Sequence, residues 1–235
     1  TQPNTLFPYT TLFRSNVGRA AMFLRLAGCN LTCSWCDTAF SWDPQHLDPE
    51  RPARELTVSD LVAELDPRTD TPELAEPAVT HLVVTGGEPL LQVRELIGLV
   101  RSLRQLGWTI EVETSGTLSP APLVEFVSQF NVSPKLRHSG VTARARIRSR
   151  VLHEFAVLPN AVFKFVVEQS SDLDEVAELV GALSLPGARV LVMAQGTSGA
   201  QVLRRSRELV DAVTARGWGL TPRWHTLLWE DARGR

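Results

Sequence analysis

Apolar residues follow two patterns along the chain, short continuous runs and longer stretches with helical spacing. The runs predict strands at residues 21–26, 81–85, 108–112, 130–133, 162–167 and 189–193. The helical spacing predicts helices at residues 57–65, 93–106, 173–183 and 201–216. Because strands and helices alternate, the pattern indicates βαβ units and a parallel sheet. Six strands are too few for a closed eight-stranded barrel, so we expect an α/β fold with an open, partial barrel.

Candidate caps and loops complete this outline. Thr57 or Ser59 is expected to cap the first helix, and Ser170 or Ser171 the third. Residues 43–54 hold three prolines and read as a loop. Residues 137–150 carry four alternating arginines and read as a solvated loop or edge strand, with a partner-binding patch as the alternative: Arg144, Arg146, Arg148 and Arg150.

Polar and glycine-rich motifs follow the predicted strands. They lie at residues 28–38, 85–88, 113–117, 133–135 and 194–197. The carboxyl ends of parallel strands meet at one edge of a sheet, and ligands bind there. We therefore expect these motifs to form a single site.

Composition narrows the class of protein. The 235 residues suit one domain, and 24 Lys and Arg against 26 Asp and Glu give a formal charge of −2. A near-neutral chain is not the usual composition of a nucleic-acid-coating protein, so we expect no direct nucleic-acid partner. No apolar run approaches the ~18 residues that span a bilayer, and no secretory pattern is present. We expect a cytoplasmic protein without membrane contact.

The three cysteines of the chain, Cys29, Cys33 and Cys36, lie within eight residues. Such a cluster cannot make a disulfide framework, but it can point at one object. One interpretation is three small buried side chains. A second is a zinc site, for which His46 is the only nearby fourth ligand. The favoured interpretation is an iron–sulfur cluster held by three thiolates, which leaves one iron open to a small molecule.

Two further motifs suit a ligand or an ordinary turn. Gly86 and Gly87 after a buried strand let the backbone approach a ligand closely, and the Glu88 carboxylate suits an ammonium group. Asp37 and Thr38 follow the last cysteine and offer a carboxylate and a hydroxyl to a hard cation such as Mg²⁺. Turn chemistry explains both motifs equally well when each is taken alone.

Cations and a histidine raise similar questions. The Ser133-Pro134-Lys135 segment is either a capped surface turn or a ligand contact. Arg25 lies in an apolar strand and needs an acidic partner, which a substrate carboxylate would supply, and Lys164 raises the same question. His225 is either a packed residue or a substrate contact.

Together these residues carry a resemblance. The C-x-x-x-C-x-x-C spacing with Trp35 before the last cysteine, combined with Gly-Gly-Glu, resembles the radical S-adenosylmethionine (SAM) superfamily. Six segments are similar to the 7-carboxy-7-deazaguanine synthase (QueE) family of queuosine biosynthesis: GCNLTCSWCDTAFSW (28–42), VTGGEPLLQ (84–92), EVETSGT (111–117), NVSPKLRHSG (131–140), FKFVVE (163–168) and PRWHTLLWEDARGR (222–235).

The resemblance implies a carbon–nitrogen lyase of the radical SAM class. Such an enzyme converts 6-carboxy-5,6,7,8-tetrahydropterin to 7-carboxy-7-deazaguanine with release of ammonia, using a [4Fe–4S] cluster, SAM and Mg²⁺. An electron from the cluster splits SAM into a radical that abstracts hydrogen from the pterin, and SAM is regenerated. The resemblance also implies a reduced partial barrel, a homodimer and an electron donor such as a flavodoxin.

Residue by residue, the resemblance assigns most of the motifs. It implies that Cys29, Cys33 and Cys36 bind the cluster and that Thr38 binds Mg²⁺. It implies that SAM contacts Trp35, Cys36, Asp37, Gly87, Glu88, Ser133, Pro134 and Lys135. It implies that the substrate contacts Arg25, Thr85 and His225.

The chain departs from the family in two places. Residues 1–15, TQPNTLFPYTTLFRS, hold no acid and lack the Gly-Glu-Gly segment that contacts substrate in the family. We expect these residues to be a foreign segment and residues 16–235 to be the radical SAM domain. Residues 193–196 read MAQG where the family has Pro and Glu in the middle. An activase that installs a glycyl radical on a partner protein and a zinc-binding interaction module remain as alternative functions.

Overall fold

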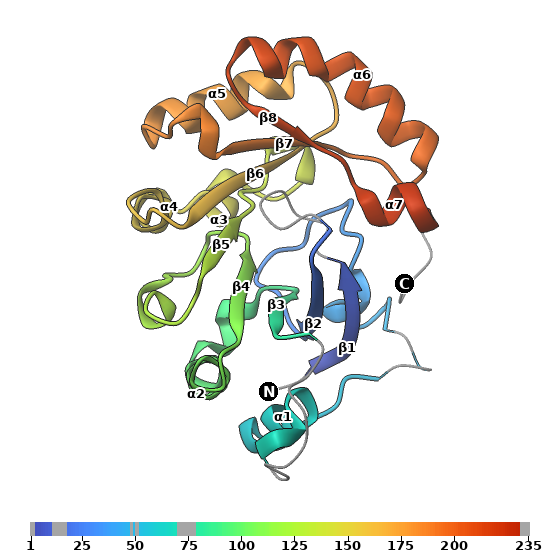
Figure 1. Cartoon of the computed structure of the whole chain (residues 1–235). Helices are drawn as coiled ribbons and strands as arrows, with labels where there is room; N and C mark the ends of the chain where they lie inside the picture. Colours follow the sequence, from blue (N-terminus) through green and yellow to red (C-terminus); the bar gives the residue numbers. More distant parts are fainter. Residues whose placement is uncertain (1–2, 11–17, 48, 50–51, 70–78, 231–235) are drawn as a thin grey trace.

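In the computed structural model, eight strands form one open sheet in sequence order, with β2 to β8 parallel and β1 antiparallel to β2 (Figure 1). Residues 3–10, 18–47, 49, 52–69 and 79–230 are described. The strands are β1 (Pro3–Thr10), β2 (Ala20–Leu26), β3 (His81–Gly86), β4 (Thr109–Thr114), β5 (Gln129–Val132), β6 (Ala161–Val167), β7 (Val190–Ala194) and β8 (Gly219–Thr221). The sheet curves into part of a barrel, as the strand–helix alternation predicted.

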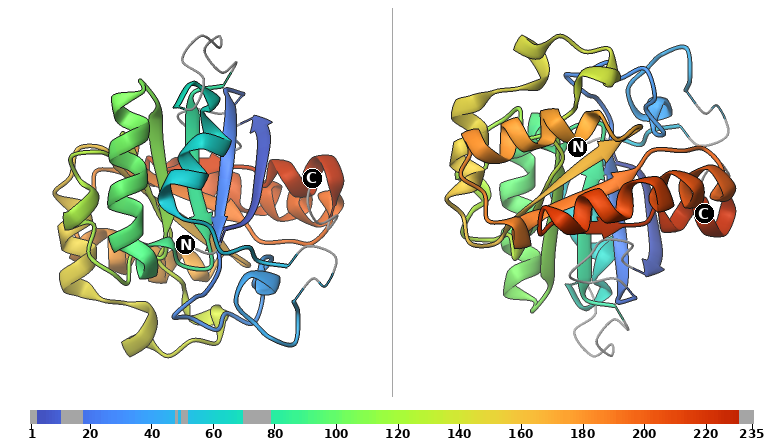
Figure 2. Two further views of the ribbon diagram at one scale, coloured as in Figure 1. Left: turned by 90° about the horizontal axis from the view of Figure 1, so that it is seen from below. Right: turned by 90° about the horizontal axis from the view of Figure 1, so that it is seen from above.

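Helices connect most of the parallel strands and lie on the outer side of the curve (Figures 1 and 2). The α-helices are α1 (Val58–Leu65), α2 (Val93–Gln105), α3 (Ala143–Arg146), α4 (Ser149–Ala156), α5 (Asp172–Ala182), α6 (Gly199–Ala215) and α7 (Trp224–Trp229). Short 3-10 turns lie at Ala39–Ser41, Pro67–Thr69, Pro89–Gln92, Ala121–Leu123, Arg137–Ser139 and Gly187–Arg189. In the described part of the chain, no helix is long and apolar enough to cross a membrane.

One of the two predicted helix caps is confirmed. The Asp60 backbone N–H donates to Thr57 Oγ1 (3.1 Å), and the Thr57 N–H donates back to the Asp60 carboxylate (3.2 Å), which makes a capping box. The prediction of a serine cap for α5 is wrong, because the Ser171 side chain makes no capping hydrogen bond. Asp172 instead accepts the N–H groups of Glu168 and Gln169 (2.9 and 3.1 Å) and orders the turn that enters the helix.

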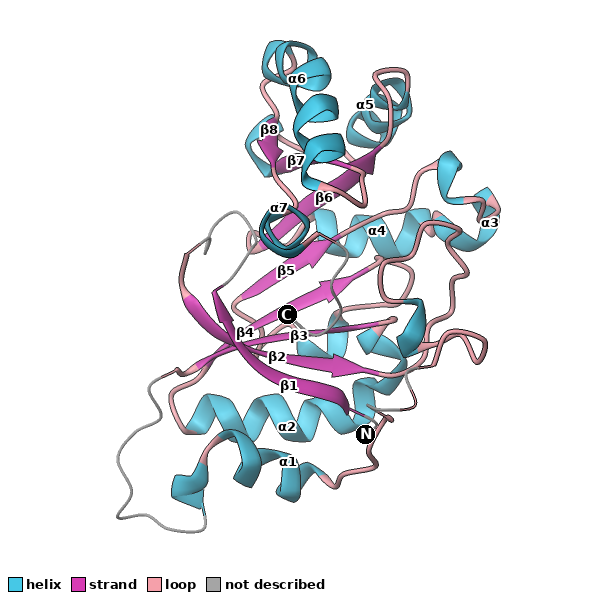
Figure 3. Cartoon of the chain, turned by 90° about the vertical axis from the view of Figure 1, so that its right-hand side faces the viewer, coloured by secondary structure: helices cyan, strands magenta, loops and turns pink. Residues whose placement is uncertain are grey.

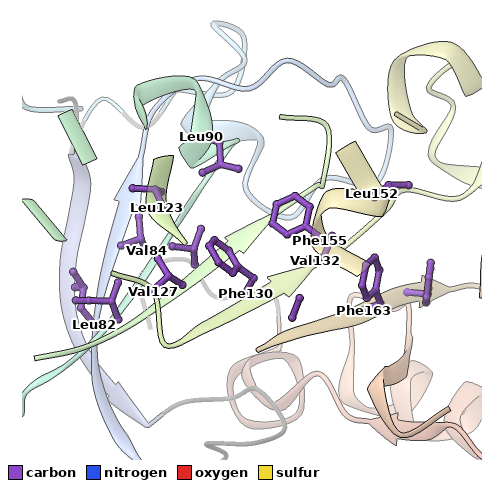
Figure 4. Packing of buried hydrophobic residues seen from close by; sticks show 14 of the residues in the cluster. Leu82, Val84, Leu90, Leu123, Val127, Phe130, Val132, Leu152, Phe155 and Phe163 are labelled. Carbon is purple, nitrogen blue, oxygen red and sulfur yellow. The ribbon is translucent and has the colours of Figure 1, made fainter. Parts of the chain in front are cut away.

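The outer face of the sheet carries the hydrophobic core (Figure 4). Alternate strand positions such as Leu82, Val84 and Phe130 point toward the helices and are fully buried. Phe130 meets Phe155 of α4 edge to face, with ring centroids 5.4 Å apart. Each such buried side chain contributes about 1.5–3 kcal/mol. This packing fixes the helices against the sheet and leaves the inner face to other residues.

The inner face of the sheet carries a cluster of buried polar side chains. The positions that alternate with the core residues hold His81, Glu111 and Asn131, all buried. His81 Nε2 lies 3.1 Å from Glu111 Oε1, and Asn131 Nδ2 donates to Glu111 Oε2 (3.1 Å). A buried carboxylate is stable only with such partners. The partial barrel therefore encloses a polar interior.

Three parts of the outline differ from the sequence prediction. The sheet has eight strands rather than six, because β1 arises from residues expected to be foreign and β8 has only three residues. A three-residue strand is too short for a recognisable pattern. Residues 137–150 were expected to form a loop or edge strand, but they contain α3 and the start of α4. Arg146 in this segment is buried, because Glu175 pairs with it (2.7 Å).

Candidate active site

The cysteine loop begins where β2 ends, at the edge of the sheet where all the parallel strands finish (Figure 3). Its three thiols are free and partly buried. The Leu31 N–H donates to Cys29 Sγ (3.4 Å), and Trp42 Nε1 donates to Cys36 Sγ (3.3 Å). Hydrogen bonds of this kind hold and tune cysteine ligands.

The electrostatics of the loop fit a bound cationic metal cluster. Burial, with smaller contributions from the nearby charges of Glu88, Cys33 and Cys36, raises the pKa of Cys29 to about 11, although the hydrogen bond from Leu31 opposes the rise. Burial also raises the pKa of Cys33, against the opposing charge of Lys135. Three close thiolates without a cation repel one another, and a metal cluster relieves that repulsion. The donor set therefore fits a cluster held by three sulfurs.

Trp35, between the second and third cysteines, packs under the loop that follows β5. Its ring stacks on His138, with centroids 5.4 Å apart and 21° between the planes. Lys135 Nζ lies 5.8 Å from the Trp35 ring centroid and donates to Ser133 Oγ (3.2 Å). Pro134 is buried between them. The tryptophan and the Ser-Pro-Lys segment thus come together, as the sequence predicted.

Position 87 accepts only glycine, because two loops touch there and leave no space for a side chain. A Cβ atom built at Gly87 would lie 2.2 Å from the Gly28 carbonyl oxygen and 2.8 Å from Cys29 Cβ. The Gly87 N–H donates to the Leu26 carbonyl (3.1 Å), and the Glu88 N–H donates to the Gly28 carbonyl (2.9 Å). The close approach expected of this glycine is therefore to the cysteine loop, whose position it sets.

Glu88 is completely buried, and its carboxylate is held by four protein donors. Oε1 accepts the Leu90 N–H (3.2 Å) and the Thr114 hydroxyl (2.8 Å). Oε2 accepts the Ser115 N–H (2.8 Å) and the Ser115 hydroxyl (2.5 Å). The side chain joins the ends of β3 and β4 in this structure. Its assignment to SAM stays a prediction.

Asp37 connects the cysteine loop to the C-terminal part of the chain. The buried Arg223 guanidinium pairs with the Asp37 carboxylate, and His225 Nε2 lies 3.7 Å from Asp37 Oδ2. Desolvation raises the pKa of Asp37, but the neighbouring His225 and the charge of Arg223 outweigh it, so the pKa lies well below its usual range. Asp37 is therefore a carboxylate at neutral pH.

A cavity of about 330 Å³ opens beside the loop, lined in part by Cys33, Cys36 and Asp37. Thr38 Oγ1 lies 3.6 Å from Cys36 Sγ, and a hydroxyl suits a water-rich cation such as Mg²⁺, which takes few protein ligands. His46 also lines the cavity, but its Nδ1 lies 2.7 Å from Asp43 Oδ2. Among the described residues, no three His, Cys, Asp or Glu side chains are arranged around one metal ion.

Thr85 belongs to an ion-pair cluster on the inner face of the sheet. Its hydroxyl donates to Glu113 Oε2 (3.3 Å), and Lys164 Nζ lies 2.9 Å from Glu113 Oε1. Arg25 is the register partner of Thr85 on β2, and its guanidinium lies 5.8 Å from the Phe40 ring centroid. Lys164 lies in an apolar strand and was expected to need an acidic partner, and Glu113 is that partner. The cluster thus joins side chains of strands β3, β4 and β6.

Most of the expected motifs meet at this edge of the sheet. Asn30 donates to Thr117 Oγ1 (3.0 Å), and the Ser133 N–H donates to the Thr114 carbonyl (2.7 Å). Residues 194–197 contact β6 and α6 instead, through Gln195. Sequence reasoning did not single out Arg223 or His138 as site residues, and it placed Glu113 at the site only as part of residues 113–117. The alternation of polar and apolar residues in TIEVET was a signal for Glu113.

An open parallel sheet with three cysteines at its carboxyl edge defines a class of protein. Residues 24–134 match the family model of the radical SAM superfamily. The crystal structure of QueE from Escherichia coli superposes with a TM-score of 0.68, at 24% identity over 94% of this chain and 93% of that one. Streptococcus suis SuiB bound to S-adenosylmethionine superposes with a TM-score of 0.56, at 16% identity over 88% of this chain and 54% of that chain. The expected fold class is confirmed.

Closer relatives place the chain within this class. The 7-carboxy-7-deazaguanine synthase of Pyrobaculum aerophilum is 40% identical over 222 residues, 94% of this chain and 90% of the relative. That of Halobacterium salinarum is 32% identical over 237 residues, 92% of this chain and 85% of the relative. The chain belongs to the 7-carboxy-7-deazaguanine synthase family. It is a radical SAM lyase, and the family uses a [4Fe–4S] cluster, SAM and Mg²⁺. The comparisons favour this function over the activase and the zinc module.

Proposed function

We propose that this chain converts 6-carboxy-5,6,7,8-tetrahydropterin to 7-carboxy-7-deazaguanine and releases ammonia. One observation supports this most: the β2 strand that leads into the cysteine loop pairs Arg25 with Thr85 of the charged inner cluster, in a chain 40% identical to a synthase along 94% of its length. A polar, carboxylated heterocycle needs such a polar interior. Neither an activase nor a zinc module has a use for it.

Cys29, Cys33 and Cys36 would hold the cluster, and Thr38 would contact Mg²⁺. When bound, the cluster with SAM supplies reversible hydrogen-atom abstraction, and Mg²⁺ supplies positive charge beside the substrate. The hydrogen bonds from Leu31 and Trp42 fix the sulfurs for this task.

The loops around the cluster would position SAM. Trp35 offers the edge of an aromatic ring beside Cys36, while Ser133 and Lys135 bring a hydroxyl and a cation to the same place. A cation suits the carboxylate of an amino-acid cofactor. Pro134, Gly87, Glu88 and Asp37 would line the same space, with Gly87 and Glu88 tying it to the sheet.

The inner face would bind the pterin. Arg25 is suited to the substrate carboxylate, because a guanidinium binds carboxylates in a bidentate geometry. Thr85 would contact the heterocycle from β3, and Glu113 holds the Thr85 hydroxyl in place. His225 would approach from the C-terminal segment, oriented by Asp37 and Arg223.

The remaining partners and boundaries are also proposals. We also propose a homodimer, for which the exposed Leu203 and Val210 of α6 are candidate contact residues. Three reduced cysteines support a cytoplasmic location and an electron donor such as a flavodoxin. We propose residues 16–235 as the radical SAM domain and residues 1–15 as foreign to the family.

The test is anaerobic reconstitution with iron and sulfide, followed by incubation with SAM, Mg²⁺, dithionite and 6-carboxytetrahydropterin. The expected result is a brown protein that forms 7-carboxy-7-deazaguanine, identified by mass spectrometry. A colourless protein that holds zinc overturns the proposal, and so does SAM cleavage without the deazaguanine product in a version carrying a family-type start. Loss of activity only with the present residues 1–15 supports their foreign origin.

Thr38→Ala tests the Mg²⁺ contact separately. We expect this variant to keep its iron content and to lose the stimulation of turnover by Mg²⁺. Thr57→Ala, which removes a hydroxyl from a remote helix cap, is the control and should keep the normal Mg²⁺ response. An unchanged Mg²⁺ titration in Thr38→Ala counts against its role.

A further inference from the structure

Arg146 differs from the other arginines of its alternating series because the fold buries it. It is 5% exposed, whereas Arg144, Arg148 and Arg150 are exposed. Its Nη1 lies 2.7 Å from Glu175 Oε1, and its Nε is buried without a hydrogen-bond partner in the described part of the chain. A buried ion pair offsets the lost hydration of its charges only when the remaining polar atoms are also bonded. Stability alone therefore does not account for an arginine at this position.

The Arg146–Glu175 pair holds the backbone of the segment that follows β5. The same Arg146 Nη1 donates to the Lys135 carbonyl oxygen (2.8 Å), and Glu175 Oε2 accepts the Arg137 N–H (2.8 Å). Leu136, which lies between these two backbone groups, is fully buried. The pair thus fixes the chain on both sides of Leu136, and it does so from two different helices, α3 and α5.

This part of the backbone carries the Lys135 ammonium group into the site. Its Nζ lies 5.8 Å from the Trp35 ring centroid and donates to Ser133 Oγ (3.2 Å). Burial raises the pKa of the Cys33 thiol, and the positive charge of Lys135 opposes that rise. A lysine side chain is flexible, so the place of its charge depends on how firmly its backbone is fixed. Movement of this backbone would move the cation relative to the cysteine loop.

We propose that Arg146 and Glu175 are positioning residues for Lys135, an inference that rests on the proposed function, in which the Lys135 ammonium binds the SAM carboxylate. The pair acts through the backbone and not on SAM itself. A charged group that is already in place loses less conformational freedom when its ligand binds, and the ligand binds more tightly for that reason. The pair therefore raises the affinity for SAM.

The test compares SAM binding by Arg146→Met with binding by two control variants of the full, reconstituted chain. Arg144→Met removes the same charge from an exposed position of α3. Arg68→Met removes a guanidinium with similar bonds, to the buried Asp66 and to the Leu106 carbonyl oxygen (3.2 Å), near the end of the sheet far from the site. Anaerobic equilibrium dialysis gives the Kd for SAM. We expect the Kd to rise about tenfold in Arg146→Met and to stay within about twofold of normal in both controls.

A double-mutant cycle tests whether Arg146 acts through Lys135. By itself, Lys135→Met should weaken SAM binding about tenfold or more, because it removes a charged hydrogen bond. Adding Arg146→Met to that variant should change the Kd by less than about threefold, since the cation that Arg146 positions is already gone. Iron content per chain and the KM for the pterin should stay normal in Arg146→Met. Arg146→Lys keeps a cation that can donate to the same acceptors, so it should recover part of the affinity.

Hydrogen exchange of the reconstituted protein without SAM measures the backbone directly. Residues 135–139 should exchange faster in Arg146→Met than in the unaltered protein and at the normal rate in Arg144→Met. If Arg146→Met folds poorly, Glu175→Gln replaces it. The glutamine oxygen can still accept the Arg137 N–H but does not pair with the guanidinium, so the Kd for SAM should rise by a smaller factor, about threefold.

A normal Kd for SAM in Arg146→Met would overturn the positioning role, even if that variant has a lower Tm. An equal rise of the Kd in Arg68→Met or Arg144→Met would overturn it too, and so would full additivity of Arg146→Met with Lys135→Met. Absence of deazaguanine product from an unaltered protein that binds SAM refutes the proposed function instead. The SAM affinities decide the positioning role in that case as well.

Discussion

Substituting Gly87 by alanine tests how the cysteine loop is positioned. The added methyl group would lie 2.2 Å from the Gly28 carbonyl oxygen, 2.7 Å from the Gly28 carbonyl carbon and 2.8 Å from Cys29 Cβ. Because a real Cβ does not come within 3.0 Å of such atoms, the two loops must separate by about 0.8 Å. Backbone atoms supply two of the three contacts, so no flexible side chain can give way.

The magnitude follows from the cost of overpacking. Inserting a methyl group into a well-packed place costs about 1–3 kcal/mol. In a chain of this size, each kcal/mol lowers Tm by about 2–4 °C, so we expect a fall in Tm of roughly 2–12 °C. Cys29 moves with the loop, and the variant should therefore take up less iron per chain than the unaltered protein after reconstitution.

The assay combines calorimetry of the apoprotein with iron and sulfide analysis after anaerobic reconstitution. Gly181→Ala in α5 is the matched control, because a Cβ there meets nothing within 4 Å. Alanine in an exposed helix position stabilises by about 0.5–1 kcal/mol relative to glycine. A Gly87→Ala protein with normal Tm and full iron content would show that the close approach does not position the loop.

Three other substitutions test separate contacts. Cys33→Ala should abolish cluster uptake and SAM cleavage, read from iron analysis and product assays, while circular dichroism stays normal; retained cleavage would refute the assignment. At the end of α1, Arg68 donates two side-chain hydrogen bonds to the buried Asp66 carboxylate (2.8 and 2.6 Å). These bonds lower the pKa of Asp66 to about 2 against the opposing effect of burial, so stability present above pH 4 is lost as the pH falls toward 2. Asp66→Asn should flatten the fall in the free energy of unfolding over that range, and an unchanged slope would count against the pairing. Arg223→Met leaves Asp37 without its ion pair and should cost about 1–3 kcal/mol, with faster hydrogen exchange in α7; Arg223→Lys should lose less. Equal exchange in both variants would contradict this role.

Local sequence patterns were sufficient for most of the elements. The six predicted strands correspond to β2–β7, because continuous apolar runs such as HLVVT suit a buried strand and no other short element. The capping box at Thr57 was also predictable, since its partners lie three residues apart. β8 and α7 were not, because elements of three and six residues hold too few positions to show a period.

The sequence alone also determined the chemistry of the cysteine loop. Three thiols in eight residues and a Gly-Gly-Glu turn are local facts, and the comparisons confirmed the family they indicated. Which side chains stand opposite them is a long-range fact. Glu88 accepts from Thr114 and Ser115, more than 25 residues away, and Asp37 pairs with Arg223 across 186 residues. Spacing along the chain carries no information about such pairs, because they exist only once the parallel strands align their carboxyl ends.

Tertiary structure decided the roles of the charged residues for the same reason. In the sequence, Arg144, Arg146, Arg148 and Arg150 form one uniform series. In the fold, Arg146 is buried against Glu175, while Arg144 and Arg148 stay exposed. Burial and pairing depend on the neighbours that folding brings within a few ångströms, and the desolvation of a charge follows from them. The sequence thus determined which chemical groups this protein has, and only the packed sheet decided which of them meet.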